Sequence, residues 1–296
     1  MPRRDRSPLF PDLGPLDTPI PIATGTVVLT QENDGSILVT VNDAPSSHHH
    51  PDPRHLVFEY MRWMKTTIDL MVSERADGDA DGSTSPAPRE IAHLGGAGCS
   101  LARALAAEHP QVRQTVVELD TVLAESARTW FSLPRAPRLR IRADDALHAL
   151  RTWRDDRFDV LIRDVFAGTR TPPELTGLEA ARHSARVLRP GGLLLANCAA
   201  APGTRELADE LATLGAAFTH VGAIAEPAHL RGKRRGNCVL LASQAPFPVG
   251  LDRALRSDAV SVRLTSDSDL ARLRMSGRVQ DPTQRGAEDP PSSAGA

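Results

Sequence analysis

The chain has no long hydrophobic run, and its basic start, Met1–Arg6, passes into Pro, Leu and Asp without an apolar segment. A membrane span needs about 20 consecutive apolar residues, so we expect neither a transmembrane helix nor an export signal. Cysteine is scarce as well: Cys99, Cys198 and Cys238 are odd in number and lack both close pairing and metal-ligand spacing. This usage fits a reducing compartment, and we expect a cytoplasmic protein.

An excess of charge is also absent. The sequence has 35 Lys and Arg against 37 Asp and Glu, a formal net charge of −2, so no nucleic-acid partner is predicted. Lysine is nearly missing, because Lys65 and Lys233 are the only two and 35 − 2 leaves 33 arginines; we interpret this as a coding bias first. With 41% hydrophobic residues over 296 positions, the chain can form one α/β domain with smaller appendages.

The first part of the chain predicts a small β unit. Residues 1–20 are proline-rich and poorly patterned, and we expect a mobile arm. The β-branched runs 26–30 and 37–41 flank Asn33-Asp-Gly, a strong hairpin signal, so residues 21–54 are assigned to an N-terminal β-hairpin unit. The stretch 46–53 is expected to be a loop.

Two segments invite a metal hypothesis that we do not favour. His48–His50 lie in the expected loop, where neighbouring histidines rarely converge on one ion without carboxylate or cysteine partners. The alternating aspartates of Ala76–Pro86 lack the closing glutamate of a calcium loop, and this polar run is predicted to be a flexible connection. No metal is expected.

After a helix expected over 56–72, strands alternate with helices. This alternation argues for a doubly wound, mostly parallel, seven-stranded Rossmann-like sheet over residues 55–245, with 246–296 as a C-terminal extension disordered from about 276. The expected strands are 91–94, 116–120, 139–142, 158–163 and 193–197, with a final pair at 216–221 and 237–242 joined by the turn Arg231–Arg235; helices are expected at 120–131, 173–188 and 206–214.

The segment Ile91-Ala-His-Leu-Gly-Gly-Ala-Gly98 joins the first of these strands to a helix. Glycines 95, 96 and 98 let the backbone approach a ligand closely, and Glu118 at the end of the second strand can accept hydrogen bonds from ribose hydroxyls. A plain tight turn between a strand and a helix would look the same. The later strands favour a nucleoside site.

Carboxylates follow the next strands as well. Asp144 and Asp145 follow the third strand and Asp164 follows the fourth, at the sheet edge where ligands bind in such folds. This set suits a sulfonium nucleoside. Helix capping is the alternative: it is equally good for Asp145 and weaker for Asp164, which has no helix immediately after it.

With these residues in place, the chain resembles the spermidine synthase (polyamine aminopropyltransferase) family within the S-adenosylmethionine-dependent methyltransferase fold. The resemblance covers roughly residues 25–243 and includes Val-Glu-Leu-Asp120, Asp145-Ala146 and Phe-Asp-Val-Leu-Ile-Arg-Asp164. It implies a methyltransferase-type sheet, and S-adenosylmethionine or its decarboxylated form as co-substrate. It also implies a small-molecule amine or another small molecule as acceptor, and it is compatible with a homodimer.

The resemblance assigns roles to residues of this chain. It places Glu118 on the ribose and Asp145 near the adenine. The other residues expected to bind the nucleoside are Gly95, Gly96, Gly98, Asp144 and Ala146. Asp164 would orient or deprotonate the attacking amine. Polyamine biosynthesis by aminopropyl transfer is the implied function.

Three positions depart from the family's pattern. Gly98 stands where an aspartate of the glycine loop would hold the aminopropyl amine, and Asp164-Val-Phe-Ala167 replaces Asp-Ser-Ser-Asp. Tyr60-Met-Arg62 replaces Tyr-His-Glu, and Arg62 has the wrong sign for a cationic polyamine. Fewer carboxylates predict weak diamine binding unless other residues replace them.

Three other functions stay open at this point. A methyltransferase of the same fold is favoured by the missing carboxylates, because a donor that retains its own carboxylate would no longer be repelled. A non-catalytic nucleoside-binding protein would keep the sheet without turnover. A nicotinamide-dependent oxidoreductase ranks last, since the antiparallel pair at 216–242 is typical of the methyltransferase-type sheet.

Overall fold

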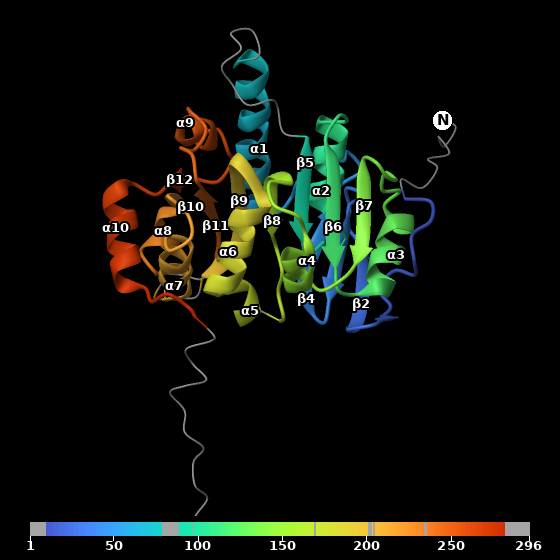
Figure 1. Ribbon diagram of the computed structural model, residues 1–296. Helices are drawn as coiled ribbons and strands as arrows, with labels where there is room; N and C mark the ends of the chain where they lie inside the picture. Colours follow the sequence, from blue (N-terminus) through green and yellow to red (C-terminus); the bar gives the residue numbers. More distant parts are fainter. Residues whose placement is uncertain are drawn as a thin grey trace, which may run out of the picture.

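The structure is a computed structural model that describes residues 10–78, 89–96, 98–168, 170–200, 203, 205–233 and 236–281. An eight-stranded sheet dominates it, with strand order β12-β10-β11-β9-β8-β5-β6-β7 (Figure 1). Strands β5 to β9 pair in parallel and the remaining pairs are antiparallel. The strands are β5 (Glu90–Leu94), β6 (Arg113–Glu118), β7 (Leu139–Ala143), β8 (Phe158–Arg163), β9 (Leu188–Ala200), β10 (His220–Ala225), β11 (Gly236–Ser243) and β12 (Arg263–Leu264).

The fold class predicted from the sequence is confirmed, with one strand more than expected. Seven strands match the predicted ones, and β12, two residues long, adds an edge beside β10. Strand β10 begins at His220 instead of Ala216, because the N–H of Phe218 bonds to the carbonyl of Leu214 and so closes the end of helix α7 (Arg205–Leu214).

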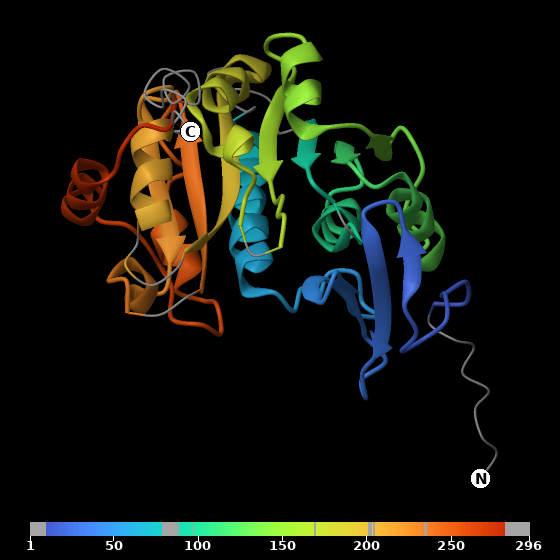
Figure 2. The same cartoon turned by 90° about the horizontal axis from the view of Figure 1, so that it is seen from below.

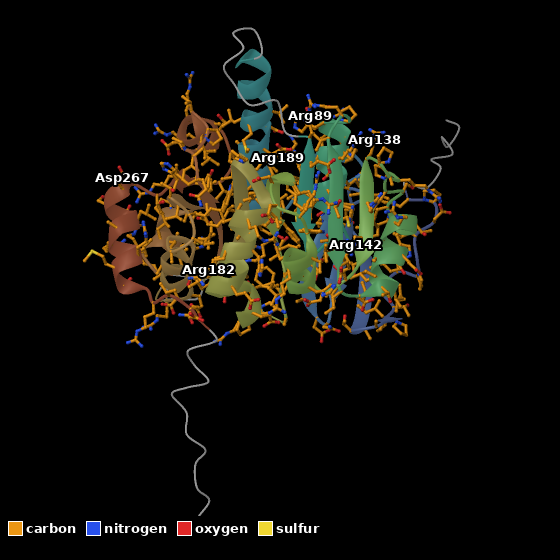
Figure 3. The ribbon with its side chains drawn as sticks, in the orientation of Figure 1. Arg89, Arg138, Arg142, Arg182, Arg189 and Asp267 are labelled. Carbon is orange, nitrogen blue, oxygen red and sulfur yellow. The ribbon has the colours of Figure 1, made fainter. Side chains whose placement is uncertain are left out.

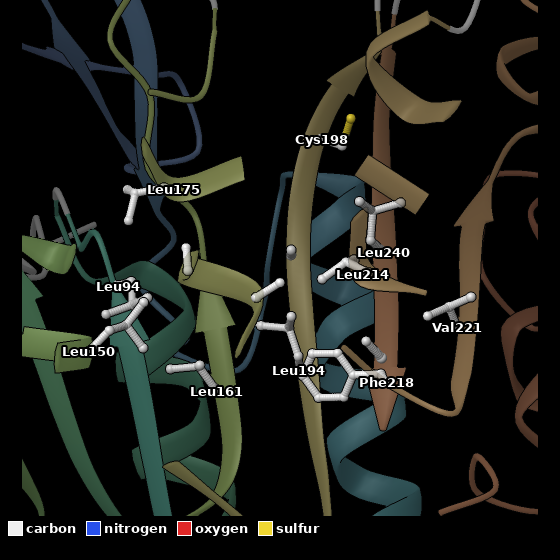
Figure 4. Packing of buried hydrophobic residues seen from close by; sticks show 14 of the residues in the cluster. Leu94, Leu150, Leu161, Leu175, Leu194, Cys198, Leu214, Phe218, Val221 and Leu240 are labelled. Atoms are coloured by element: carbon white, nitrogen blue, oxygen red, sulfur yellow. The ribbon is translucent and has the colours of Figure 1, made fainter. Parts of the chain in front are cut away.

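Helices cover both faces of the sheet because its strand residues are apolar on both sides. Leu161 and Leu194 face the core shared with α4 (Ala146–Thr152), α6 (Leu178–Val187) and α7 (Arg205–Leu214), as Figure 4 shows. Their neighbours Ile162 and Leu195 face α1 (Glu59–Gly78) and α2 (Ser100–Glu108). The period-two alternation of strand side chains explains this division.

The N-terminal unit is a four-stranded antiparallel sheet, larger than the predicted hairpin. Its strands are β1 (Ile20–Ile22), β2 (Gly25–Gln31), β3 (Ile37–Val41) and β4 (Ala44–His49). The predicted hairpin is the β2–β3 pair. The expected loop at 46–53 was wrong in its first part: Asn42 and Asp43, at φ +48° and +64°, make a tight turn that folds residues 44–49 back onto β3.

Asp120 fastens this small sheet to the main domain. One carboxylate oxygen caps α3 (Thr121–Trp130) by accepting from the Leu123 N–H at 2.8 Å, and the other accepts from the backbone N–H of Thr24 at 2.6 Å and its hydroxyl at 2.8 Å. Burial opposes ionisation, but the hydrogen bonds from Leu123 and Thr24 outweigh it and lower the pKa of Asp120.

We expect Asp120→Ala to lower the free energy of unfolding by about 2–4 kcal/mol, since it removes a helix cap and two further hydrogen bonds to a charged group. A lowered pKa contributes stability above the ordinary aspartate pKa, and that stability is lost as the pH falls through the lowered value. The difference in free energy of unfolding between wild type and Asp120→Ala should therefore become smaller at acid pH. Denaturant unfolding at pH 7 and pH 3 measures this difference, with Asp155→Ala at an exposed position as control. An equal loss of stability at both pH values would contradict the stabilising role of the ionised Asp120.

Both ends of the described chain are packed more than the sequence suggested. In the expected arm, Phe10 is 7% exposed and packs edge-on against Phe131, so 10–20 does not behave as a free segment; residues 1–9 lie outside the description. In the extension, α9 (Leu251–Leu255) and α10 (Asp267–Ser276) pack on the domain, and the Arg278 N–H bonds to Asp209. The order thus extends past 276; residues 282–296 lie outside the description.

Two further expectations need adjustment. The helix predicted over 173–188 is split into α5 (Pro173–Thr176) and α6 by Gly177, and strand β9 already begins at Leu188. Residues 76–78 of the expected linker end α1, and its remainder lies outside the described residues. In the part of the chain that the structure describes, no helix has both the length and the apolar character for a membrane crossing.

Candidate functional site

A cleft of about 810 Å³ opens at the carboxyl ends of the parallel strands. Figure 2 looks onto this edge, with the N-terminal sheet in blue beside it. Seven of the eight predicted site residues line the cleft, and Gly98 is the exception. The seven are Gly95, Gly96, Glu118, Asp144, Asp145, Ala146 and Asp164.

The glycine loop is shaped by close backbone packing. Gly95 has φ +78°, and a Cβ there would lie 2.3 Å from the backbone oxygen of Asp164. A Cβ at Gly96 would lie 2.4 Å from Val116, whereas one at Gly98 would lie 2.7 Å from Nε2 of His49 in the N-terminal sheet. Glycine is thus needed at 95 and 96 beside the cleft and at 98 for packing between the two sheets.

Glu118 ends β6 directly beside this loop. Its Oε2 accepts from the Gly96 N–H at 3.1 Å and its Oε1 accepts from the Asp120 N–H at 3.0 Å. Two backbone donors therefore hold the carboxylate in one orientation at the cleft wall. A carboxylate can accept several hydrogen bonds, and Glu118 lines the cleft, so hydroxyl groups of a ligand are suitable donors to it.

The turn after β7 places Asp144, Asp145 and Ala146 at the same wall. Asp145 caps α4 through a 2.8 Å bond from the His148 N–H, so the capping alternative is confirmed for one of its oxygens. Asp144 accepts from Arg142 at 2.9 Å and from the N–H of Asp145 at 2.9 Å. Capping and ligand contact are compatible, because Asp145 also lines the cleft.

Asp164 stands at the end of β8 with a hydrogen bond on each carboxylate oxygen. The Tyr60 hydroxyl on α1 donates to Oδ2 at 2.9 Å, and Nδ2 of Asn197 on β9 donates to Oδ1 at 3.0 Å. No helix begins immediately after Asp164, since α5 starts at Pro173. Three elements therefore converge on this carboxylate, which lines the cleft and caps no helix of the described chain.

Burial controls the protonation of these groups. Withdrawal from solvent raises the pKa of Asp164, and the hydrogen bonds from Asn197 and Tyr60 and the charge of Arg163 oppose that rise. Burial and the neighbouring Asp164 raise the pKa of Tyr60 far above its ordinary value, so the phenol stays protonated. A carboxylate whose pKa is raised is a stronger base than an ordinary aspartate.

Among the residues that the structure describes, the cleft lining carries five carboxylates and no lysine or arginine. The fifth is Glu174 on α5, which the sequence analysis did not predict. His93 also lines the cleft, but burial lowers its pKa to about 4, so its imidazole is neutral at pH 7. Arg138 and Arg142, which lie just before and within the edge strand β7, are exposed on the outside (Figure 3). The cleft is therefore electrostatically suited to a cation.

The structure resolves one concern raised by the sequence and shows how the neighbouring histidines of β4 lie. Arg62 does not line the cleft; its guanidinium binds Asp258 of the C-terminal extension through two hydrogen bonds of 2.9 and 3.0 Å. Its expected repulsion of a cationic ligand was therefore wrong. His48 and His49 alternate along β4, His48 toward Glu32 and His49 stacked on Phe131, and no metal-binding cluster occurs among the described residues.

Asn197 is the functional candidate that the sequence analysis missed. It is the polar residue that ends the apolar run predicted as a strand at 193–197, the same signal that identified Glu118 and Asp164, although β9 itself continues to Ala200. It is 2% exposed, and its Oδ1 has no hydrogen-bond partner among the described residues. An unpartnered buried amide oxygen is rare in proteins, and here it belongs to a residue of the cleft wall.

The fold and cleft define a transferase with the methyltransferase-type fold. A probable spermidine synthase from Corynebacterium glutamicum ATCC 13032 is 34% identical and superposes with a TM-score of 0.79 over 96% of this chain and 100% of that chain. The chain belongs to the spermidine synthase family. A spermidine synthase in complex with the transition state analogue AdoDATO shares the fold, with a TM-score of 0.57, 15% identity, and 88% and 82% of the two chains covered.

Curated relatives match over shorter stretches. A polyamine aminopropyltransferase of Vibrio vulnificus (strain CMCP6) is 27% identical over 115 residues, 38% of each chain. An eEF1A lysine and N-terminal methyltransferase homolog of Drosophila melanogaster is 31% identical over 116 residues, 36% of this chain and 17% of that protein. These matches span less than two thirds of either relative. No family profile matches the chain.

Proposed function

We propose that the cleft binds decarboxylated S-adenosylmethionine and an amine and transfers the aminopropyl group between them. The observation that carries this proposal is the described part of the cleft lining, which has five carboxylates and no lysine or arginine. Both substrates are cationic, through a sulfonium and ammonium groups. In its partly desolvated surroundings a cation without a carboxylate partner would be costly to bind.

The glycine loop favours a donor without its own carboxylate. The N–H of Gly95 bonds to the carbonyl of Val117 at 2.9 Å, and that of Gly96 bonds to Glu118. These two amides are thus occupied by the protein itself. The described lining residues include five carboxylates and no lysine or arginine, so a donor carboxylate would meet mainly like charge there and the decarboxylated donor is preferred.

The residues divide along the cleft. Glu118 accepts the ribose hydroxyls, the turn Asp144–Ala146 contacts the adenine, and Gly95 and Gly96 allow close approach of the nucleoside. Asp164 lies at the boundary with the acceptor side, which Tyr60 and Asn197 share. The AdoDATO complex of the related synthase supports a ligand of this type.

The transfer is an in-line displacement. The amine nitrogen uses its lone pair to form a bond to the carbon next to sulfur while the C–S bond breaks. The electron pair of the C–S bond stays on sulfur, which leaves as methylthioadenosine. Asp164 accepts the proton that the amine must lose, and its raised pKa makes this favourable. Holding both substrates at one site supplies much of the rate enhancement.

Methyl transfer is the second candidate, favoured by one observation. Gly98 stands where the family's aspartate would hold the aminopropyl amine, and neither Gly95, Gly96 nor Cys99 offers a carboxylate in its place. A donor that keeps its α-carboxylate would then meet less repulsion than in a typical family member. The donor itself therefore discriminates between the two functions.

We expect purified protein to release methylthioadenosine from the decarboxylated donor in the presence of a diamine, and at least about 100-fold less product from S-adenosylmethionine, because about 3 kcal/mol of unpaired-charge cost separates the donors. Mass analysis of the nucleoside product measures this. Release of S-adenosylhomocysteine would establish methyl transfer instead. Binding of either donor in calorimetry without any product would indicate a non-catalytic nucleoside-binding protein.

A further inference from the structure

An ion pair is buried directly behind Asp164. Arg163, the preceding residue of β8, is 5% exposed, and its partner Glu210 on α7 is 6% exposed. The guanidinium NH2 group lies 2.5 Å from Oε2 of Glu210. Neither residue lines the cleft, so neither contacts a bound substrate there.

The same guanidinium bonds to two elements of the cleft wall. Its NH1 group donates to the carbonyl of Leu175 on α5 at 3.0 Å, and its NH2 group donates to the carbonyl of Asn197 on β9 at 3.2 Å. Asn197 in turn donates through Nδ2 to Asp164. Arg163 thus connects the strand that carries Asp164 to the two neighbouring segments that shape the acceptor side.

A buried ion pair is an inefficient way to stabilise a fold. The cost of removing both charges from water offsets most of their attraction, and apolar residues of similar size often serve stability equally well or better. The geometry here has a different consequence. A planar guanidinium donates in fixed directions, so it sets the relative positions of the groups that accept from it.

We propose that Arg163 is a positioning residue of the transfer reaction, which holds Asn197 and helix α5 in place around the carboxylate of Asp164. This inference rests on the transfer reaction proposed above. Glu210 serves the same arrangement by pairing with the guanidinium from α7, outside the cleft lining. Displacement of reacting groups by about 1 Å can slow a reaction about 100-fold.

Arg163 also acts on Asp164 through charge. The described groups that influence the ionisation of Asp164 are Asn197 from β9, Tyr60 from α1 and Arg163 from its own strand. Burial raises the pKa of Asp164, and the positive charge of Arg163 lowers it. Removing that charge should therefore raise the pKa further and move the acid limb of the pH profile to higher pH.

The test uses the double variant Arg163→Met with Glu210→Met, which removes both charges and leaves no unpaired ion in the core. We expect kcat to fall about 100-fold, with less than a threefold change in KM for the donor. We also expect an acid limb shifted upward. Arg163→Lys, which keeps the charge and loses the planar fork, should lower kcat without shifting the limb. Thermal unfolding verifies that each variant is folded.

A matched control removes an ion pair at the opposite end of the same strands. Arg189 bonds to Asp159 at 2.6 Å near the amino ends of β8 and β9. The variant Arg189→Met with Asp159→Asn should leave kcat and the pH profile within about twofold of wild type, because the pair lies far along the strands from Asp164. Equal losses in both double variants would show a merely structural role and overturn the proposal.

Tyr60 provides a readout that does not require turnover. It is the single tyrosine of the chain, so protein labelled with carbon-13 at tyrosine Cζ gives one resonance from the phenol that bonds to Asp164. Its shift should titrate with Asp164, and the inflection should move to higher pH in the double Met variant. If wild type makes no product but the inflection moves, the transfer reaction fails and the link to Asp164 stands. An unmoved inflection with unchanged kcat overturns the inference.

Discussion

Asp164→Asn is expected to reduce kcat for aminopropyl transfer by about 100- to 10,000-fold, the usual contribution of a positioned general base. The amide cannot accept the amine's proton, yet it is nearly the same shape as the carboxylate and can still accept one of the two hydrogen bonds from Tyr60 and Asn197. Donor binding should change little. Steady-state turnover and calorimetry with the decarboxylated donor separate the two effects.

The same substitution should not reduce stability. Because burial raises the pKa of Asp164 in the folded state, folding favours its protonated form, and the carboxylate costs stability once the pH exceeds the ordinary aspartate pKa. Asparagine removes that cost. We therefore expect the variant to melt at or above the wild-type temperature at pH 7, with no gain below about pH 4.

The wild-type pH profile provides a second check on Asp164. Turnover should fall as the pH drops through a pKa above the usual aspartate range, and the variant should lose this acid limb. Asp252→Asn, at an exposed ion pair with Arg256, is the matched control and should behave like wild type. A variant that keeps more than one tenth of wild-type kcat would remove Asp164 from its proposed role.

Glu118→Gln is expected to weaken donor binding by about 10- to 100-fold, since a hydrogen bond to a charged group contributes about 1.5–3 kcal/mol. Both carboxylate oxygens accept from backbone N–H groups, of Gly96 and Asp120. The amide nitrogen of glutamine would face one of these donors, so the side chain must rotate or the loop must shift. The ribose then loses its oriented acceptor.

The Glu118→Gln substitution should change the affinity for the donor more than the rate of the chemical step. We expect a raised KM and Kd for the donor, with kcat reduced less than tenfold at saturation, because the ribose lies away from the reacting carbon. Glu179→Gln, at an exposed ion pair with Arg151, is the control. If calorimetry gave the variant wild-type affinity, the ribose contact would have to be assigned elsewhere in the cleft.

Much of the site could be predicted because parallel strands end at one edge. A polar residue directly after an apolar strand must lie at that edge whatever the rest of the fold does, and this placed Glu118, Asp144 and Asp164 together before any coordinates. The same logic applied to the strand ending at Asn197 would have found the partner of Asp164. Periodicity likewise predicted the order and type of the main elements.

Contacts between distant segments could not be predicted in this way. Arg62 was placed against the ligand by its position near Tyr60, whereas the structure turns it onto Asp258, nearly two hundred residues later. Gly98 was grouped with the nucleoside-binding glycines, but it is small because His49 of the N-terminal sheet packs against it. Neither partner is visible from local sequence spacing.

The sequence by itself therefore determined the sheet, its glycine turn and the carboxylates at the strand ends, because apolar periodicity and turn chemistry act over a few residues. Tertiary structure alone decided which charges meet. It placed Glu174 in the cleft, removed Arg62 from it, and brought Glu210 and Arg163 together behind Asp164. Charge pairing depends on three-dimensional distance, which the order of residues along the chain does not specify.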